Sequence, residues 1–412
     1  MKKSVLSIIG FGILTNGVFA QTPISVVQKD SLAGVLNTIT TAVPFLMIAP
    51  DSRAGGMGDV GAATTPDANS IHWNPAKLAF IEKDLGFSVS YTPWLRALVN
   101  DISLAYLSGY KKLKGDQTIA ISLLYFSLGN ITFTDNFGNV TGQFNPNEFA
   151  IDAAYARKLG EDFSGGLALR YIYSNLTGGI GVANTASHAG TSVAADVSVY
   201  YRHEIEISGK KTMWSSGVDI SNIGSKVSYT ETGTKDFIPM NFRIGSTLTT
   251  DLDEYNRFAF SLDANKLLVP TPPVYLKSVS GGDSLDGNSN KIIMAGKDPN
   301  VGVASAIFQS WSDAPGGFKE EFKEWQWSAG VEYWYDKQFA IRTGYFHEAL
   351  TKGGRQYFTV GAGLKYNVFG LDFAYLIPTA QRNPLENTLR FTLIFDFAGL
   401  KNEADKDKDK TE

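Results

Sequence analysis

Hydrophobic and polar residues alternate in segment after segment from about residue 85 to residue 397. The last such segment, LRFTLIFDF (389–397), places Leu, Phe, Leu, Phe and Phe on one face and Arg, Thr, Ile and Asp on the other. A period of two with one apolar face indicates a half-buried β-strand. The pattern predicts about fourteen strands, near residues 85–92, 100–109, 117–127, 147–158, 163–174, 191–204, 211–221, 238–249, 256–266, 325–335, 338–347, 356–366, 368–377 and 387–397.

The links between these strands differ in length. Short links such as 159–162 follow the even-numbered strands, whereas longer ones such as 128–146 and 267–324 generally follow the odd-numbered strands. Short turns at one end and long loops at the other are typical of an outer-membrane barrel. We therefore expect an all-β membrane protein, an antiparallel barrel of about 14 strands whose apolar faces contact membrane lipids. A soluble β-sandwich is the alternative, and it does not explain the loop lengths.

The start of the chain predicts export. Lys2 and Lys3 precede an apolar run, and Val18-Phe19-Ala20 resembles a cleavage site, so residues 1–20 are interpreted as a signal peptide. The protein is then expected in the cell outer membrane as a multi-pass barrel. Both termini would lie on the periplasmic, short-turn side, and the charged residues 398–412 would form a periplasmic tail.

Residues 21–84 lack the strand pattern. Residues 31–41 predict a short helix with Ser31 as N-cap and Pro44 as stop. The stretch 49–80 is rich in Gly and Ala and has neither helical nor strand period. We interpret it as a compact plug in the lumen of the barrel, residues 85–397.

The polar faces of the strands would point into this lumen. They carry acidic residues and arginines: Asp152, Asp196, Asp219, Asp263, Glu332, Asp372, Asp396, Arg170, Arg202, Arg243, Arg342 and Arg390. Two interpretations stay open. The charges form networks with polar groups of the plug, or they line a hydrated wall without specific partners.

Composition narrows the candidate chemistry. The chain has no Cys, which excludes disulfides, thiolate metal sites and a Cys nucleophile. A net charge of −4 gives no indication of a nucleic-acid partner. The four His residues do not share metal-ligand spacing, and neither G-x-S-x-G nor H-E-x-x-H occurs. We predict no catalytic residue, cofactor or metal, although pattern alone leaves a lumenal hydrolase open.

One motif suggests a nucleotide site. Residues 56–61 (GMGDVG) match G-x-G-x-x-G, but that site requires a preceding strand and a following helix. Pro50 and Asp51 precede the motif, and AATTPDANS follows it. The glycines instead favour tight packing of the plug.

The link 267–324 is long enough to suggest a function of its own. It contains the apolar run VGVASAIFQSW (301–311), from which Val301, Ile307, Phe308 and Trp311 are candidate partner contacts. The alternative is a self-packed cap over the pore.

The segments SRAGGMGDVGAA (52–63) and WNPA (73–76) resemble the N-terminal hatch of FadL-type outer-membrane proteins. The longer string ITTAVPFLMIAPDSRAGGMGD (39–59) is similar to the PorV (LptO) family of the type IX secretion system of Bacteroidetes. The resemblance assigns a structural plug role to Ser52, Arg53, Gly55, Gly56, Gly58, Asp59, Gly61, Asn74 and Pro75.

The resemblance also implies a function and partners. PorV-like proteins associate with the SprA/Sov translocon barrel. They bind secreted cargo by the cargo's C-terminal secretion domain and deliver it to the attachment complex of PorU, PorQ and PorZ. The sortase chemistry belongs to PorU, so the chain would be a non-enzymatic carrier. A FadL-like channel for hydrophobic small molecules is the second hypothesis. A channel needs an apolar lumenal pocket, whereas the predicted inward faces are charged.

Overall fold

The computed structural model describes residues 32–397, apart from residues 33, 97, 136, 180–185, 232, 279–281 and 382. The expected signal peptide (1–20) and charged tail (398–412) lie outside the described residues. No helix in the described ranges is both long and apolar enough to cross a membrane.

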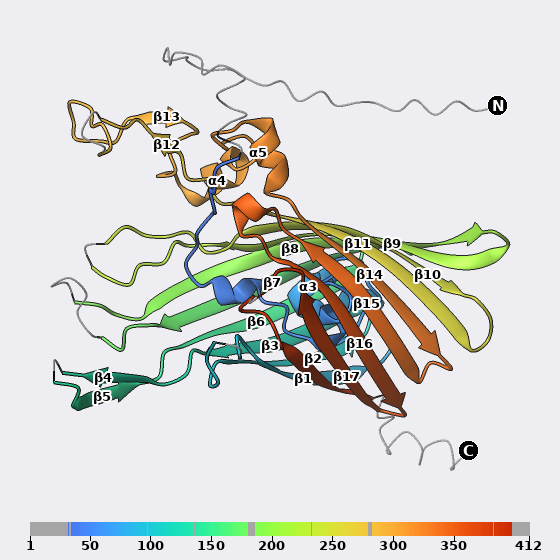
Figure 1. Ribbon diagram of the computed structural model, residues 1–412. Coiled ribbons are helices and arrows are strands. Elements are labelled where there is room, and N and C mark those ends of the chain that lie inside the picture. The colour runs from blue at the N-terminus through green and yellow to red at the C-terminus, as the bar shows by residue number, and fades with distance from the viewer. Residues whose placement is uncertain are drawn as a thin grey trace, which may run out of the picture.

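Fourteen antiparallel strands close into a barrel, which confirms the predicted fold (Figure 1). Closure is made by β1 and β18, where Leu85 pairs with Phe397. The barrel strands are β1 (Leu85–Pro93), β2 (Ser103–Leu113), β3 (Gln117–Ser127), β6 (Asn147–Lys158), β7 (Phe163–Asn175), β8 (Gly190–Ile207), β9 (Lys210–Gly224), β10 (Asn241–Asp251), β11 (Asn256–Leu267), β14 (Gln326–Tyr335), β15 (Phe339–His347), β16 (Gln356–Tyr366), β17 (Phe369–Pro378) and β18 (Leu389–Phe397).

The two ends of the barrel differ, as the link lengths predict. One end carries short turns such as 159–162 and 208–209, and we call it the short-turn end. The other, the long-loop end, carries the hairpin β4 (Ile131–Thr134)–β5 (Val140–Phe144) and the link 268–325. Within that link lie β12 (Val274–Tyr275), β13 (Ile293–Ala295), α4 (Val303–Gln309) and α5 (Phe318–Lys323). The link 348–355 at the same end holds η3 (Leu350–Lys352).

Side chains on each strand alternate between a buried inner face and an exposed outer face. In β3, Ile119 and Ile121 are 43% and 61% exposed, whereas Ala120 and Ser122 are buried. The exposed face is the apolar one. This inversion of the soluble pattern suits a barrel surrounded by hydrocarbon, where lipid provides no hydrogen bonds and a sheet must close on itself.

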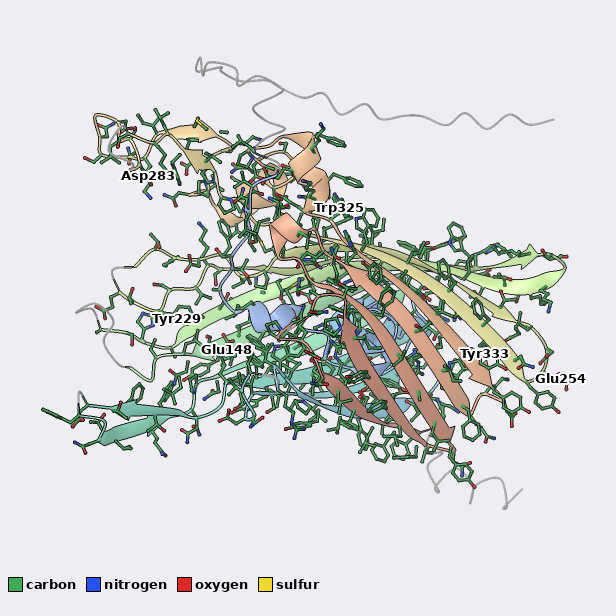
Figure 2. The ribbon with its side chains drawn as sticks, in the orientation of Figure 1. Glu148, Tyr229, Glu254, Asp283, Trp325 and Tyr333 are labelled. Atoms are coloured by element: carbon green, nitrogen blue, oxygen red, sulfur yellow. The ribbon has the colours of Figure 1, made fainter. Side chains whose placement is uncertain are left out.

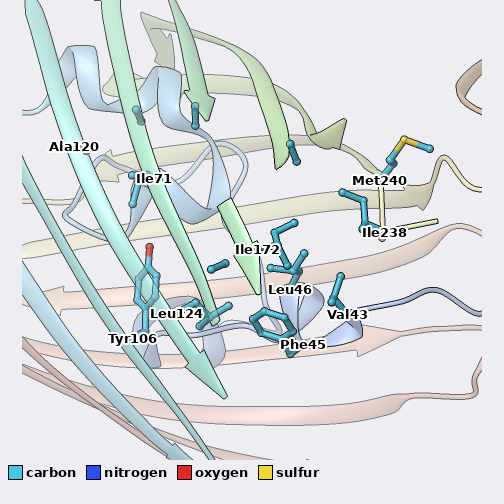
Figure 3. Close-up of a cluster of buried hydrophobic side chains, with 14 of the residues drawn as sticks. Val43, Phe45, Leu46, Ile71, Tyr106, Ala120, Leu124, Ile172, Ile238 and Met240 are labelled. Atoms are coloured by element: carbon cyan, nitrogen blue, oxygen red, sulfur yellow. The ribbon is translucent and has the colours of Figure 1, made fainter. Parts of the chain in front are cut away.

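Residues 42–81, which we call the inner segment, lie inside the barrel. The segment contains the short helices η1 (Pro44–Met47), α2 (Ser52–Gly55), α3 (Ser70–Trp73) and η2 (Pro75–Phe80). Figure 3 shows Phe45 and Leu46 of η1 against Leu124 and Ile172, whose side chains point inward from β3 and β7. The hydrophobic core therefore forms between the inner segment and the wall.

The predicted helix over residues 31–41 is wrong for the described residues 36–41, which are irregular. Asn37 donates its backbone N–H to Thr351 and its side-chain Nδ2 to Pro272 and Glu320. We call residues 36–41 the strap, because these bonds hold them across the long-loop end. The hydrogen-bonding groups of Asn37 are used by distant partners and not by a helical turn.

The strap fixes where the described chain enters the barrel. Asn37 lies at the long-loop end, whereas Phe397 ends β18 at the short-turn end. The described chain therefore enters from the long-loop end, runs through the lumen over residues 42–81 and finishes at the short-turn end. The two chain ends lie outside the described residues, so their common periplasmic side stays a prediction.

Candidate functional sites in the lumen and the long loop

The G-x-G-x-x-G stretch lies in the inner segment, and its backbone N–H groups bond to other groups of the protein at Gly56, Met57, Gly58, Asp59 and Gly61. The N–H groups of Gly61 and Ala62 both donate to Oδ2 of Asp263 in β11, over 2.7 Å and 2.8 Å. Gly61 also packs against Trp73, since a Cβ at Gly61 would lie 2.2 Å from that ring. Donors that would face a phosphate in a nucleotide loop face an internal carboxylate here.

Arg53 of α2 is the centre of an ionic network in the lumen. Its guanidinium contacts Asp67 of the inner segment at 2.8 Å and Glu332 of β14 through two nitrogens. Glu332 also accepts from Arg342 at 2.7 Å, and Arg342 reaches Asp372 at 2.6 Å. All of these side chains are largely buried, so the charges are paired as burial requires.

A second network centres on Asp59. Its carboxylate accepts from Arg390 of β18 at 2.8 Å and from the hydroxyl of Tyr357 in β16. Gly55 lies directly against Arg390, because a Cβ there would be 2.3 Å from Nη1. The small residue therefore leaves room for the guanidinium that holds Asp59.

Charges also pair within the wall itself. Arg170 of β7 contacts Asp152 of β6 at 2.6 Å and Asp196 of β8 at 3.1 Å. Of the two interpretations of the inward charges, specific networks fit the geometry, and they include both wall–wall and wall–segment pairs.

Asp51 organises the start of α2. Its Oδ1 accepts from the N–H of Ala54 and its Oδ2 from Nε1 of Trp73, at 2.9 Å and 2.7 Å. Burial raises the pKa of Asp51 to about 6. The next residue, Ser52, donates its N–H to Thr392 of β18 at 2.9 Å, so the helix cap is fastened to the wall.

Gly56 and Gly58 bring the segment's backbone close to the strands. Gly58 has φ +70°, and a Cβ there would lie 2.7 Å from the backbone of Tyr345 in β15. A Cβ at Gly56 would lie 3.2 Å from the Cα of Gly361 in β16. A positive φ and close approach both favour glycine.

Asn74 and Pro75 begin η2. The Asn74 side chain accepts from Ala76 at 3.0 Å and donates to the carbonyl oxygen of Val199 in β8 at 3.1 Å. Pro75 occupies the first helical position, where its missing N–H costs nothing. Ser164 of β7 donates to the carbonyl oxygen of Ala76 at 2.7 Å, so this end of the segment is bonded to two strands.

The link 268–325 divides the four candidate partner contacts into two pairs. Val301 and Ile307 pack against the hydrophobic core around the buried Ala306 of α4. Phe308 and Trp311 are 78% and 43% exposed. The apolar run is therefore partly a self-packed cap and partly an exposed surface.

An ionic clamp that the sequence analysis missed fastens this cap to the barrel. Glu320 and Glu321 of α5 and Glu324, which directly follows it, are buried. Lys266 of β11 binds Glu321 at 3.1 Å and also binds Glu324, while Lys352 binds Glu320 at 2.6 Å and Glu324 at 3.0 Å. The only sequence signal for this clamp is the acidic run EEFKE (320–324). The run does not indicate its lysine partners, because they lie far away in the sequence.

Comparison with known proteins gives one family and several solved structures. The family model described as type IX secretion system protein PorV matches residues 32–274, more than half of the chain. No curated protein sequence matches.

Solved structures with a similar course include the Pseudomonas putida toluene transporter TodX, at 10% identity and TM-score 0.46, covering 87% of this chain and 98% of that one. The CymD monoaromatic hydrocarbon channel is similar at 12% identity and TM-score 0.45, covering 87% and 100%. A Pseudomonas aeruginosa FadL homologue has 10% identity and TM-score 0.40, covering 88% and 99%.

The match over residues 32–274 includes the inner segment and the strands from β1 to β11. This chain belongs to the PorV family of type IX secretion system proteins.

Proposed function

We propose that this chain is a non-enzymatic carrier that binds secreted cargo through the cargo's C-terminal secretion domain at the translocon and passes it to the surface attachment complex. The family match carries this proposal, because it makes the chain an outer-membrane component of the type IX secretion system. The proposed partners are an SprA/Sov-type barrel, the cargo, and PorU, PorQ and PorZ.

The packing of the inner segment supports a carrier over a channel. Its contacts with the wall are ionic and hydrogen-bonded, for example Arg53 with Glu332 and Asp59 with Arg390. We propose that residues 42–81 act as a plug and that cargo is handled outside the lumen. A channel for hydrophobic small molecules would need an apolar path where these charges lie.

The exposed part of the cap is the proposed cargo-facing surface, with the long-loop end extracellular. Phe308 projects from α4 with most of its surface free, and Trp311 follows it. An exposed aromatic on a cap clamped by buried ion pairs is pre-organised for a protein partner, which lowers the entropic cost of binding.

The test is affinity purification of the full chain in mild detergent, with identification of co-purifying proteins. Phe308→Asp should reduce cargo recovery about tenfold, since it places a charge in an aromatic contact. Phe137→Asp is the matched control, because Phe137 is 91% exposed on a different long loop. Stoichiometric fatty acid with no translocon or cargo protein would overturn the proposal in favour of a channel.

A further inference from the structure

A groove of about 580 Å³ crosses the outer wall of the barrel between β7 and β15. Its floor consists of small side chains, which include Ser216, Ser246 and Ala329. Larger side chains, among them Leu262 and Trp327, stand around the floor.

The groove lies where the backbone of the inner segment comes close to the wall. Gly217 of β9 and Gly245 of β10 line the groove, and a Cβ at Gly217 would lie 2.1 Å from the carbonyl oxygen of Ala62. The neighbouring Gly344 of β15 would place a Cβ 2.1 Å from the carbonyl carbon of Met57. Glycine on the inner face and small side chains on the outer face together leave the wall thin here.

The hydroxyl groups of Ser216 and Ser246 in the floor are already hydrogen-bonded. Ser246 Oγ donates to the carbonyl oxygen of Ser215 at 3.2 Å and accepts from Trp214 Nε1 at 2.9 Å. Ser216 Oγ lies 3.4 Å from Ser246 Oγ. The floor therefore offers few free polar partners to water, and an enclosed water needs two to four such partners.

The surrounding wall is the lipid-facing surface of the barrel. Val199, Ile244 and Leu262 line the groove and are 37%, 41% and 50% exposed. In a membrane these side chains contact hydrocarbon. An empty groove would forfeit dispersion contacts along its whole lining, so a flexible apolar chain is the occupant that this environment supplies.

One end of the groove continues into exposed aromatic rings at the base of α5. The Trp327 ring lies 6.1 Å from the Phe322 ring and 6.1 Å from the Trp325 ring. Trp325 is labelled beside the cap in Figure 2. Phe322 and Phe318 are 57% and 84% exposed.

The polarity of α5 is reversed relative to a soluble amphipathic helix. Glu320 and Glu321 of α5 and the following Glu324 are buried against lysines, whereas Phe318 and Phe322 face outward beside the exposed Lys319. Aromatic side chains are enriched at membrane interfaces, where an apolar ring meets polar head groups. The reversal and the continuity with the lipid-facing wall both point to lipid as the occupant.

We propose that this groove binds one acyl chain of a membrane lipid from the leaflet at the long-loop end. The chain lies on the floor formed by Ser216, Ser246 and Ala329, and the head group of the lipid lies beside Trp327 and Phe322. This lipid site goes beyond the proposed carrier function and does not depend on it.

The experiment reconstitutes the full chain in nanodiscs of palmitoyl-oleoyl phosphatidylethanolamine, exchanges it into detergent, and counts retained lipid by native mass spectrometry. The unmodified chain should retain one lipid. Ala329→Phe fills the floor between Leu262 and Tyr345 and should reduce retention about tenfold. Ala105→Phe is the matched control, since Ala105 lies between Tyr91 and Tyr125 on the outer face of β2 and should leave retention unchanged.

Equal retention by Ala329→Phe and the unmodified chain, or no retained lipid in either, would overturn the proposal. If Ala329→Phe instead lost a protein that co-purifies with the unmodified chain and kept its lipid, the groove would be a protein contact, and the proposal would also be overturned. A second measurement avoids dependence on the folding of Ala329→Phe. Trp327→Phe identifies the part of the fluorescence that comes from Trp327. Phospholipid with brominated acyl chains should quench that part already at one lipid per protein chain. Quenching only at a large excess of lipid would contradict the site.

Discussion

Arg53 of the inner segment and Glu332 of β14 form a two-pronged ion pair across the lumen, with Nε 3.0 Å from Oε2 and Nη2 2.8 Å from Oε1. The pair joins residues that are 279 positions apart in the chain. We predict that Arg53→Met lowers the free energy of unfolding by about 3–5 kcal/mol, because it leaves a buried carboxylate short of a partner. Urea unfolding of the barrel in detergent measures this loss.

The control for Arg53 is Arg257→Met. Arg257 and Asp251 form a pair whose side chains are 39% and 58% exposed, so its removal should cost at most about 1 kcal/mol. Equal effects of the two substitutions would mean that the inner segment contributes no more to stability than a surface pair does.

Gly58 supports a second prediction, about close approach. An alanine at Gly58 must adopt φ +70° and meet the backbone of Tyr345 at 2.7 Å. An alanine at Gly209 must adopt φ +76°, but it meets nothing within 4 Å. Both variants carry the cost of a left-handed alanine, roughly 1 kcal/mol. Gly58→Ala should lose more stability than Gly209→Ala, and the heat-induced gel shift of the barrel provides the measurement. Identical melting would exclude a packing role for Gly58.

The barrel could be predicted from sequence because its signal is local and repeated. The expected strand 117–127 coincides with β3 (Gln117–Ser127), and 356–366 coincides with β16 (Gln356–Tyr366). Each strand exposes an apolar face to lipid, so the period of two persists across the whole wall. The strand bounds follow less closely: the expected strands 100–109 and 238–249 begin three residues before β2 (Ser103–Leu113) and β10 (Asn241–Asp251).

The interior could not be predicted in the same way, because its contacts join distant residues. Nothing near Arg53 indicates Glu332, and nothing near Glu324 indicates Lys266. The helix expected over residues 31–41 failed for a related reason. Asn37 bonds to Pro272 and Glu320, and these tertiary partners outweigh a weak local helix preference.

The clamp on the cap supports a third prediction. Lys266→Met should leave the carboxylate of Glu321 without its lysine in a buried site, while Glu324 keeps only Lys352 of its two lysines. We expect faster hydrogen exchange of the α5 amides, because the cap then opens more readily. Lys277→Met is the control, since Lys277 pairs with Asp283 on an exposed hairpin with its own side chain 66% exposed. Unchanged exchange of α5 in Lys266→Met would contradict the clamp.

The last prediction concerns pH and Asp313, which precedes α5. Burial raises the pKa of Asp313 from 3.8 to about 6, and the nearby carboxylates of Glu321 and Glu324 add to the rise. The folded cap therefore holds a proton that the open cap releases between pH 3.8 and 6, so protection of the cap falls as pH rises through this window and is constant above it. Asp313→Asn stays neutral and keeps an oxygen acceptor for the N–H of Thr271. Hydrogen exchange of the α5 amides, corrected for intrinsic rates, should show the Asn variant better protected than the unmodified chain at pH 7 and equal to it near pH 4.

Asp286→Asn is the control and should have the opposite effect on the amides of its own turn. The N–H groups of Asn290 and Asn288 lower the pKa of Asp286, so its ionised form is the stabilising one. A pH-independent difference between Asp313→Asn and the unmodified chain would show that the Asp313 proton does not control the cap.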